Sequence, residues 1–287
     1  MNLLREDTIF LRQEEDNAKA FKLAVVPMNQ KCGSGPTRTP EQACASKGEL
    51  QTIQPFPSTG HLAGNKGVTL TALRCYMVKV DSKAYSYVVS SVKLNKQTKG
   101  FEQHGSAPNF QGDLLTLCTC KHQMRARRKI GDWKDVWVAG LTSRTLHQGK
   151  HWLFYLAKIK SAYESHADLW RSLESEIRNA KEANRHYLGD LFRPKLTQLQ
   201  GNDRYSPSRY VIPATHTHRR QPDDICWHND IKCHHATKYG YSSLLVADPE
   251  LTFIWDRPTV YAREKHCRNY HTWSSFADLD SKLELAE

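Results

Sequence analysis

The 287-residue sequence predicts an α+β fold: a mixed, mostly antiparallel sheet or small barrel with one main helix and a disordered N-terminal arm. Several runs rich in β-branched and aromatic residues, which are typical of strands, precede the first strong helical period. The sequence shows no regular alternation of strands and helices, which argues against a doubly wound parallel sheet. Turn-forming residues dominate the first quarter of the chain, which indicates little regular structure there.

The predicted arm covers residues 1–75. Clusters of Gly, Pro, Ser and Thr, such as residues 31–37 and 54–60, interrupt any helical or alternating apolar pattern. Such a composition buries too little apolar surface to offset the entropy of ordering the backbone, so a short helix over residues 8–23 is the only element expected. Met77 offers an alternative start of the chain, and residues 76–287 are the predicted folded domain.

The expected strands follow the β-branched and aromatic runs, and the expected helix follows a 3.6-residue apolar period. The strands are residues 84–92, 114–120, 136–139, 152–159, 210–212, 243–247 and 251–255. Apolar residues recur at helical spacing between residues 166 and 185, with charged residues such as Lys181 assigned to the solvent face. A shorter helix is expected at the C-terminus, over residues 274–285.

The composition favours a polyanionic partner. Lys and Arg number 41 against 30 Asp and Glu, a formal charge of +11, and most of the excess falls outside the arm, which has 9 basic and 7 acidic residues. No apolar stretch is long enough for a membrane helix, and the charged N-terminus does not fit a signal peptide. Eight dispersed Cys fit reduced thiols, so the expectation is a cytoplasmic protein without a membrane partner.

A basic run occupies residues 121–130. It carries five positive side chains and no acid, and Gly131-Asp132-Trp133 follows as a turn. The predicted contacts to nucleic-acid phosphates come from Lys121, Arg125, Arg127 and Arg128. Trp133, Trp137 and Trp227 are candidates for stacking on a base. The alternative is a solvated loop whose arginines pair with nearby carboxylates.

Histidines gather in the last part of the chain, where seven of the 14 follow residue 210. In an extended segment His216 and His218 share a face, and His228 and Asp230 repeat that spacing. These four residues are the candidate catalytic residues, either as acid and base or as ligands of a divalent metal ion. Their alternative role is hydrogen bonding to the backbone. A structural zinc site using Cys226 and Cys233 is a further alternative, although the spacing lacks the usual paired Cys motif.

Two other patterns restrict the set of possible functions. Cys118 and Cys120 share a strand face, where a bridge between them is unfavourable, so a buried structural role is expected. The sequence contains no Gly-rich phosphate loop and no dinucleotide fingerprint, which argues against a nucleotide-hydrolysing motor and a nicotinamide enzyme.

Several motifs occur together in this chain. They are residues 105–112 (Gly-Ser-Ala-Pro-Asn-Phe-Gln-Gly), 115–121, Gly131-Asp132-Trp133, residues 137–140 (Trp-Val-Ala-Gly), 187–195, 227–231 and 244–250. On these motifs, residues 84–260 resemble the nucleotide-modification-associated domains, in particular the second of those families. The resemblance implies a role in modifying the bases of phage or mobile-element DNA, or in recognising such bases.

Within the first motif, Pro108 fixes one backbone dihedral and Gly112 removes a side chain, so the loop is able to approach a ligand closely. Asn109 is therefore added to the candidate nucleic-acid-binding residues. At the level of fold, the Gly-Asp turn before an apolar strand is similar to small base-reading barrels of the pseudouridine-synthase-associated type.

Three functions remain open from the sequence. The first is a DNA-binding protein of a base-modification or phage-defence system that binds a modified base, and the second is a metal- or His-dependent enzyme that installs, trims or removes a modification. The third is a scaffold subunit that contacts other proteins of such a system. The first two require the basic run and the His-bearing segment to converge in space. The sequence specifies neither the base, the strand state of the DNA, a cofactor, a metal nor an oligomeric state.

Overall fold

The computed structural model describes residues 54–55, 62, 64–77, 82–90, 92–103, 108–119, 121–144, 149–183, 191–211, 227–232, 242–264, 266 and 270–286. All of them lie in the larger of two compact units into which the chain divides, residues 44–287. The helix expected over residues 8–23 and the candidates His216 and His218 lie outside the described residues.

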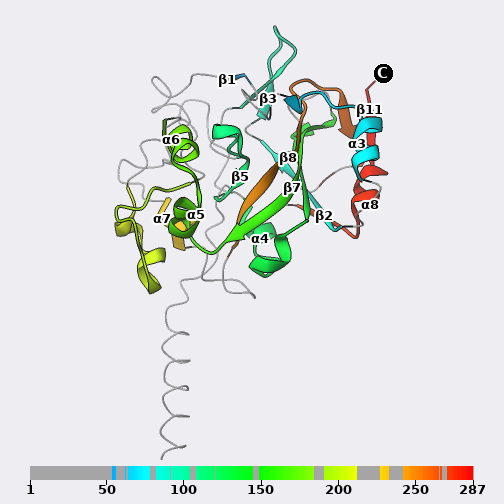
Figure 1. The fold of residues 1–287 in the computed structure, drawn as a ribbon. Coiled ribbons are helices and arrows are strands. Elements are labelled where there is room, and N and C mark those ends of the chain that lie inside the picture. Colours follow the sequence, from blue (N-terminus) through cyan, green and yellow to red (C-terminus); the bar gives the residue numbers. More distant parts are fainter. Residues whose placement is uncertain are drawn as a thin grey trace, which may run out of the picture. The chain divides into compact units, whose positions relative to one another are not determined.

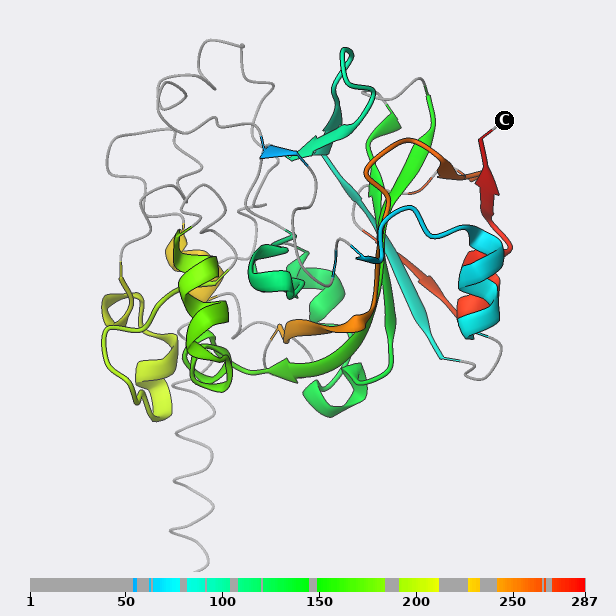
Figure 2. The same ribbon diagram turned by 45° about the horizontal axis from the view of Figure 1, so that its top comes forward.

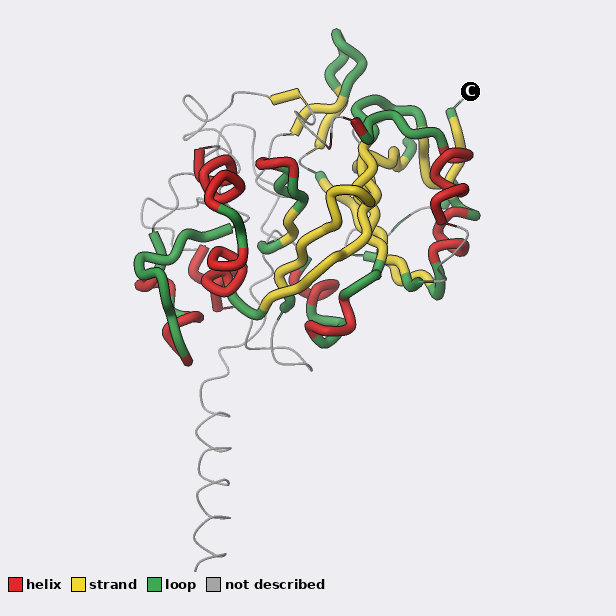
Figure 3. Tube along the Cα trace, in the orientation of Figure 1, coloured by secondary structure: helices red, strands yellow, loops and turns green. Residues whose placement is uncertain are grey.

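A curled mixed sheet forms the centre of this unit, as the strands in Figures 1 and 3 show. Its path is β10 (His271–Trp273), β2 (Ala84–Val89), β6 (Trp137–Thr142), β7 (His151–Tyr163), β8 (Leu244–Ile254) and β5 (Thr116–Leu117). β2 and β6 pair in parallel, and the other neighbours on this path pair antiparallel. The predicted α+β class with a mixed, mostly antiparallel sheet is confirmed.

Shorter strands extend this arrangement. β9 (Val260–Ala262) pairs with the start of β7 and with β11 (Leu283–Leu285). A separate antiparallel sheet contains β1 (Gln54–Pro55), β4 (Phe101–Gln103) and β3 (Val92–Leu94). The predicted strand over residues 84–92 is therefore divided between two sheets.

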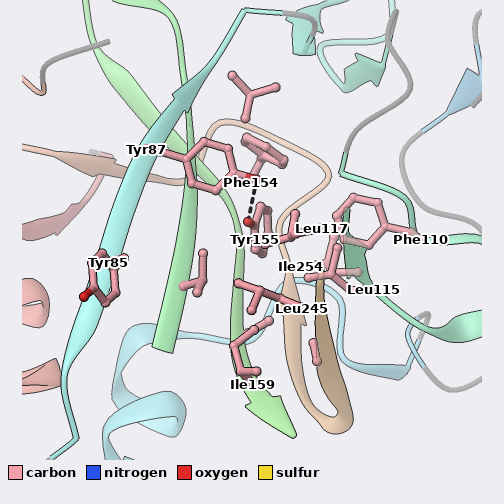
Figure 4. Packing of buried hydrophobic residues seen from close by; sticks show 14 of the residues in the cluster. Tyr85, Tyr87, Phe110, Leu115, Leu117, Phe154, Tyr155, Ile159, Leu245 and Ile254 are labelled. Carbon is pink, nitrogen blue, oxygen red and sulfur yellow. Dashed lines mark hydrogen bonds between the residues drawn. The ribbon is translucent and has the colours of Figure 1, made fainter. Parts of the chain in front are cut away.

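The central sheet is buried on both faces, because alternate residues of a strand point to opposite sides. In β2, Tyr85 and Tyr87 join one apolar cluster, whereas Ala84 and Val88 join another. The first cluster includes Phe110, Phe154 and Tyr155, and Figure 4 shows these rings among the aliphatic side chains of β5, β7 and β8. Burial of both faces explains why the strands read as continuous apolar runs.

Two helices cover the second cluster. α3 (Leu70–Met77) and α8 (Phe276–Asp280) lie side by side at one edge in Figures 1 and 2. Leu70 and Leu73 of α3 pack in the same cluster as Phe276 and Leu279 of α8, and Arg74 forms an ion pair with Asp280 at 2.7 Å. The hydroxyl of Thr69 accepts a hydrogen bond from the amide of Ala72, which caps the start of α3.

The boundary predicted at residue 75 is therefore too late. The side chains of Leu62, Leu70 and Leu73 are buried, and the Asn65 amide donates to the carbonyls of Pro249 and Thr252. The described residues between 54 and 75 thus belong to the fold rather than to a separate arm. Burial of three leucines stabilises this arrangement by several kcal/mol, at roughly 1.5–3 kcal/mol each.

The predicted main helix over residues 166–185 is two helices, α5 (His166–Ser172) and α6 (Ser175–Ala183). Leu173 between them has an extended ψ of 146° and is buried in a cluster with Leu244 and Val246 of β8 and with Leu114 and Cys118, which flank β5. The Ser172 hydroxyl donates to the carbonyl of Leu169, and this bond competes with continuation of the helix. Packing of Leu173 therefore overrides the local helical period.

Three further predictions need correction. Tyr210 forms only an isolated bridge with Pro194, so the described part of residues 210–212 contains no strand. The two strands expected at residues 243–247 and 251–255 are one strand, β8. The C-terminal helix expected over residues 274–285 ends at Asp280, and β11 follows.

The remaining short helices are α4 (His122–Arg125), α7 (Trp227–Lys232) and the 3₁₀ helices η1 (Gln111–Asp113), η2 (Ile130–Trp133), η5 (Gly201–Tyr205) and η6 (Pro207–Arg209). Among the helices that the structure describes, none has the length and apolar character needed to cross a membrane. Of the five cations of the predicted basic run, α4 carries Arg125, and the other four precede α4 or lie between α4 and η2. α7 carries Asp230.

Candidate nucleic-acid interface

The basic run contains one short helix, α4, and ends where the 3₁₀ helix η2 begins, so it is not one flat cationic loop. Lys121 has a left-handed backbone (φ 57°) and precedes α4, and η2 follows after Lys129. Side chains that are neighbours in this segment point in different directions. The cations counted in the sequence are therefore not all on the surface.

Arg125 points into the protein. Its side chain is fully buried, and its guanidinium donates to the carbonyls of Ser243 (2.8 Å) and Ser242 (3.3 Å). The Arg125 carbonyl accepts a hydrogen bond from the indole of Trp133, which is also fully buried and packs against Tyr85. Arg125 and Trp133, both predicted to contact nucleic acid, are therefore not on the surface. Their side chains instead hold α4 and η2 against the strands beneath them. Trp137, another predicted stacking residue, is likewise buried.

Three cations of the run remain accessible: Arg127 and Lys129 are exposed and Arg128 is half-buried. The Arg127 guanidinium lies 5.6 Å from the centre of the Tyr270 ring and donates to the Tyr270 hydroxyl. Arg128 donates to the backbone carbonyl of Asp132 at 2.8 Å. We call Arg127, Arg128 and Lys129 the basic surface.

The basic surface lacks carboxylate partners within the described part of the chain: no ion pair there involves any of its three residues. Other cations are neutralised, as Lys158 is by Asp135 and Arg204 by Asp168, both at 2.8 Å. The described residues therefore do not form the alternative structure, in which the arginines of the run pair with nearby carboxylates. The charge of the basic surface is available to an external anion.

Lys121 lies over a buried aromatic group. Its ammonium is 5.5 Å from the centre of the Tyr87 ring, and the Tyr155 hydroxyl donates to the Tyr87 hydroxyl at 2.7 Å, the dashed line in Figure 4. Phe110 packs edge-on against Tyr155. Half-buried Lys121 thus connects the basic run to the core that the Asn109 motif also joins.

Asn109 has an internal role. Its side chain is buried, and its carbonyl oxygen accepts hydrogen bonds from the Gln111 amide (2.9 Å) and the Lys181 ammonium (3.3 Å). Lys181 is 1% exposed and also donates to the Leu114 carbonyl (2.8 Å) and the Thr116 hydroxyl (3.1 Å). Its predicted place on the solvent face of the helix is therefore wrong, because three oxygens offset the cost of burying the ammonium.

Gly112 fits the same packing. It has a φ of +71°, and a Cβ there would lie 3.2 Å from the Cα of Ile177 in α6. The motif around Asn109 thus joins η1 to α6 through a close backbone approach and a buried lysine. In the described residues the motif packs against other parts of the protein. It does not lie on the open surface, where a ligand-binding loop is expected.

Asp230 meets the basic run. Its buried carboxylate lies 3.2 Å from the Nε2 of His122, and the two residues come from α7 and α4. His122 was not among the predicted catalytic residues, and nothing in the sequence joins two positions 108 residues apart. The basic run and part of the His-bearing segment therefore meet at one point.

His228 and Asp230 do not share a face, since residues 227–232 form a helix rather than an extended segment. His228 is half-buried. In the part of the chain that the structure describes, no group of three or more His, Cys, Asp or Glu side chains is arranged to hold a metal ion. The predicted catalytic set of His216, His218, His228 and Asp230 remains a prediction.

In a comparison with protein families, the model described as nucleotide modification associated domain 2 matches residues 82–198. The match confirms the resemblance over β2 to the segment before η5, which includes the basic run and the Asn109 motif. The family description associates this part of the chain with nucleotide modification. No curated protein and no solved structure matches the chain.

Proposed function

Because residues 82–198 match nucleotide modification associated domain 2, we propose that this protein binds DNA through the basic surface, as the component of a base-modification or phage-defence system that contacts a modified base. One observation carries the proposal: Arg127, Arg128 and Lys129 have no carboxylate partner in the described residues. Guanidinium groups free of internal ion pairs bind phosphate oxygens without first losing a salt bridge.

Tyr270 adds an aromatic face to this surface. It is half-buried and lies against the Arg127 guanidinium. Bases stack on exposed aromatic rings, and an arginine next to such a ring contacts the phosphate that follows the base. Tyr270 takes the stacking role that the sequence assigned to Trp133 and Trp137.

The first prediction compares two triple variants that remove equal charge. Replacing Arg127, Arg128 and Lys129 by glutamine is expected to weaken DNA binding and to lower the salt dependence, by nearly one unit of log–log slope per phosphate contact removed. Fluorescence anisotropy with single- and double-stranded oligonucleotides, with and without modified bases, measures both quantities across a salt series.

The control carries Lys93→Gln, Lys96→Gln and Lys99→Gln around the β3–β4 turn, where all three lysines are exposed. This variant has the same net charge as the first and should retain nearly all the affinity. Equal losses in the two variants would mean that net charge alone attracts DNA, and the basic surface would not be the site.

A second function is favoured by the contact between His122 and Asp230. A buried carboxylate beside an imidazole, here 3.2 Å from its Nε2, is an arrangement that general acid–base chemistry uses. We propose, as the alternative to binding alone, that His122 exchanges a proton with a base held at the basic surface. His216, His218 and His228 remain further candidates.

The second prediction tests this alternative. His122→Gln and Asp230→Asn are each expected to lower product formation at least about a hundredfold, since a general acid or base contributes roughly 10²–10⁴ in rate. Mass spectrometry of nucleosides from DNA incubated with the protein measures the product, and anisotropy checks that DNA binding is retained. Unchanged product in either variant removes His122 and Asp230 from the chemistry.

A further inference from the structure

Two buried histidines lie apart from the basic surface and contact each other. His151 begins β7 opposite Ala262 of β9, and His266 follows the end of β9. Their side chains are 5% and 6% exposed, and their ring centres are 5.7 Å apart. Neither residue has a role in the function proposed above.

The backbone fixes which nitrogen of each ring carries the proton. His151 Nδ1 lies 2.7 Å from the Thr142 carbonyl oxygen, and His266 Nδ1 lies 3.0 Å from the Glu264 carbonyl oxygen. A carbonyl oxygen only accepts hydrogen bonds, so each Nδ1 must be the donor. In the neutral ring the lone pair is then on Nε2.

Both Nε2 atoms are buried and have no hydrogen-bond partner among the described residues. An unsatisfied buried acceptor costs roughly 1–3 kcal/mol, and here two such acceptors lie in one cluster. Burial also lowers the pKa of both His151 and His266, which keeps the rings neutral near pH 7. A ligand that accepts these lone pairs would offset the cost of burying them.

We propose that His151 and His266 bind a transition-metal ion of the zinc, copper and nickel class through their Nε2 atoms. Neutral imidazole is a preferred ligand of these ions, and metal-binding histidines commonly donate the other ring N–H to a backbone carbonyl. Both rings have that second bond. The inference is independent of the DNA-binding proposal.

His271 supplies a third ligand from the surface. It begins β10, is exposed, and its ring centre lies 6.0 Å from that of His266. Its ring packs against Trp273, which also contacts His266. No three donors of the described residues converge in the present side-chain arrangement, so coordination by His271 requires rotation about its exposed side-chain bonds.

The third prediction uses the full-length protein after treatment with a chelator. Zn²⁺ and Co²⁺ are titrated by calorimetry and by cobalt absorption, with one ion expected for the cluster. His151→Gln and His266→Gln are each expected to weaken that binding at least about tenfold, and His271→Gln by less. Circular dichroism confirms that each variant is folded.

Nitrogen NMR of the imidazole rings gives a readout that does not depend on affinity. Before metal addition, His151 and His266 should both show a protonated Nδ1 and an unprotonated Nε2, and Zn²⁺ should shift the two Nε2 signals only. A different tautomer in either ring, or unmoved Nε2 signals at saturating metal, overturns the proposal.

Acid should release the metal, because protons compete for the same lone pairs. Because burial lowers the pKa of both rings, affinity is expected to fall only at a pH below the ordinary histidine value of about 6.5. The charged or titratable groups facing the pair are Arg144, Glu264 and His271. Glu264→Gln should leave the loss of affinity in place, and affinity that persists at every acid pH at which the protein stays folded overturns the assignment to imidazoles.

Discussion

Replacing Arg125 with methionine is expected to lower the free energy of unfolding by about 3 kcal/mol. The variant fills a similar volume but leaves the carbonyls of Ser242 and Ser243 buried without their donor. Each buried polar group that loses its partner costs roughly 1–3 kcal/mol. Urea denaturation followed by tryptophan fluorescence measures the change, and an unchanged m-value shows that the unfolding reaction is the same.

The matched control for this prediction is Arg127→Met, two positions along the chain. Arg127 is exposed, and we expect a change in unfolding free energy within about 0.5 kcal/mol. Its effect should instead appear in DNA binding, where loss of a phosphate contact weakens affinity. Equal destabilisation by the two substitutions would contradict the buried position of Arg125.

Arg125 and Arg127 differ in burial, a property of the basic run that the sequence did not predict. Charge patterning is local, and it correctly identified a cationic segment, but it assigned Lys121, Arg125, Arg127 and Arg128 the same role in contacting phosphates. The hydrogen bonds that bury Arg125 come from residues 117 and 118 positions later in the chain. No local pattern encodes such a contact, so burial within the run could not be predicted.

The strands were easier to predict than the helices. β-branched and aromatic runs located β2, β6, β7 and β8, because strand residues buried on both faces are apolar throughout. α3 was missed since it follows a turn-rich segment and shows only a short apolar period. Its stability comes from packing against α8, at the other end of the chain.

The candidate site was likewise predicted only in part. The sequence proposed that the basic run and the His-bearing segment converge, and the contact between His122 and Asp230 agrees at that one point. The sequence paired Asp230 with His228 by assuming an extended segment, whereas residues 227–232 are helical. The motif resemblance identified the family but not the internal role of Asn109, which depends on Lys181 in a later helix.

Gly140→Ala is expected to destabilise the protein most, by about 3 kcal/mol or more. A Cβ at this position would lie 2.2 and 2.4 Å from two ring carbons of Tyr155 and 2.7 Å from one of Phe154. Gly140 is paired with Tyr155 across β6 and β7, and the Tyr155 hydroxyl is held by Tyr87. Overpacking a close-packed core usually lowers the free energy of unfolding by roughly 1–3 kcal/mol. The Tyr155 ring has little room to move, because β7 holds its backbone end and Tyr87 holds its hydroxyl.

Two comparisons separate this overpacking from a general effect of replacing glycine. Gly131→Ala should be nearly neutral, because nothing lies within 4 Å of a Cβ placed there. Gly140→Ala should cost much less in a Tyr155→Leu background, where the ring that meets the new methyl group is gone. Thermal and urea unfolding of the four variants measures the coupling. Additive costs for Gly140→Ala and Tyr155→Leu would mean that the glycine is needed for its backbone and not for the space it leaves to Tyr155.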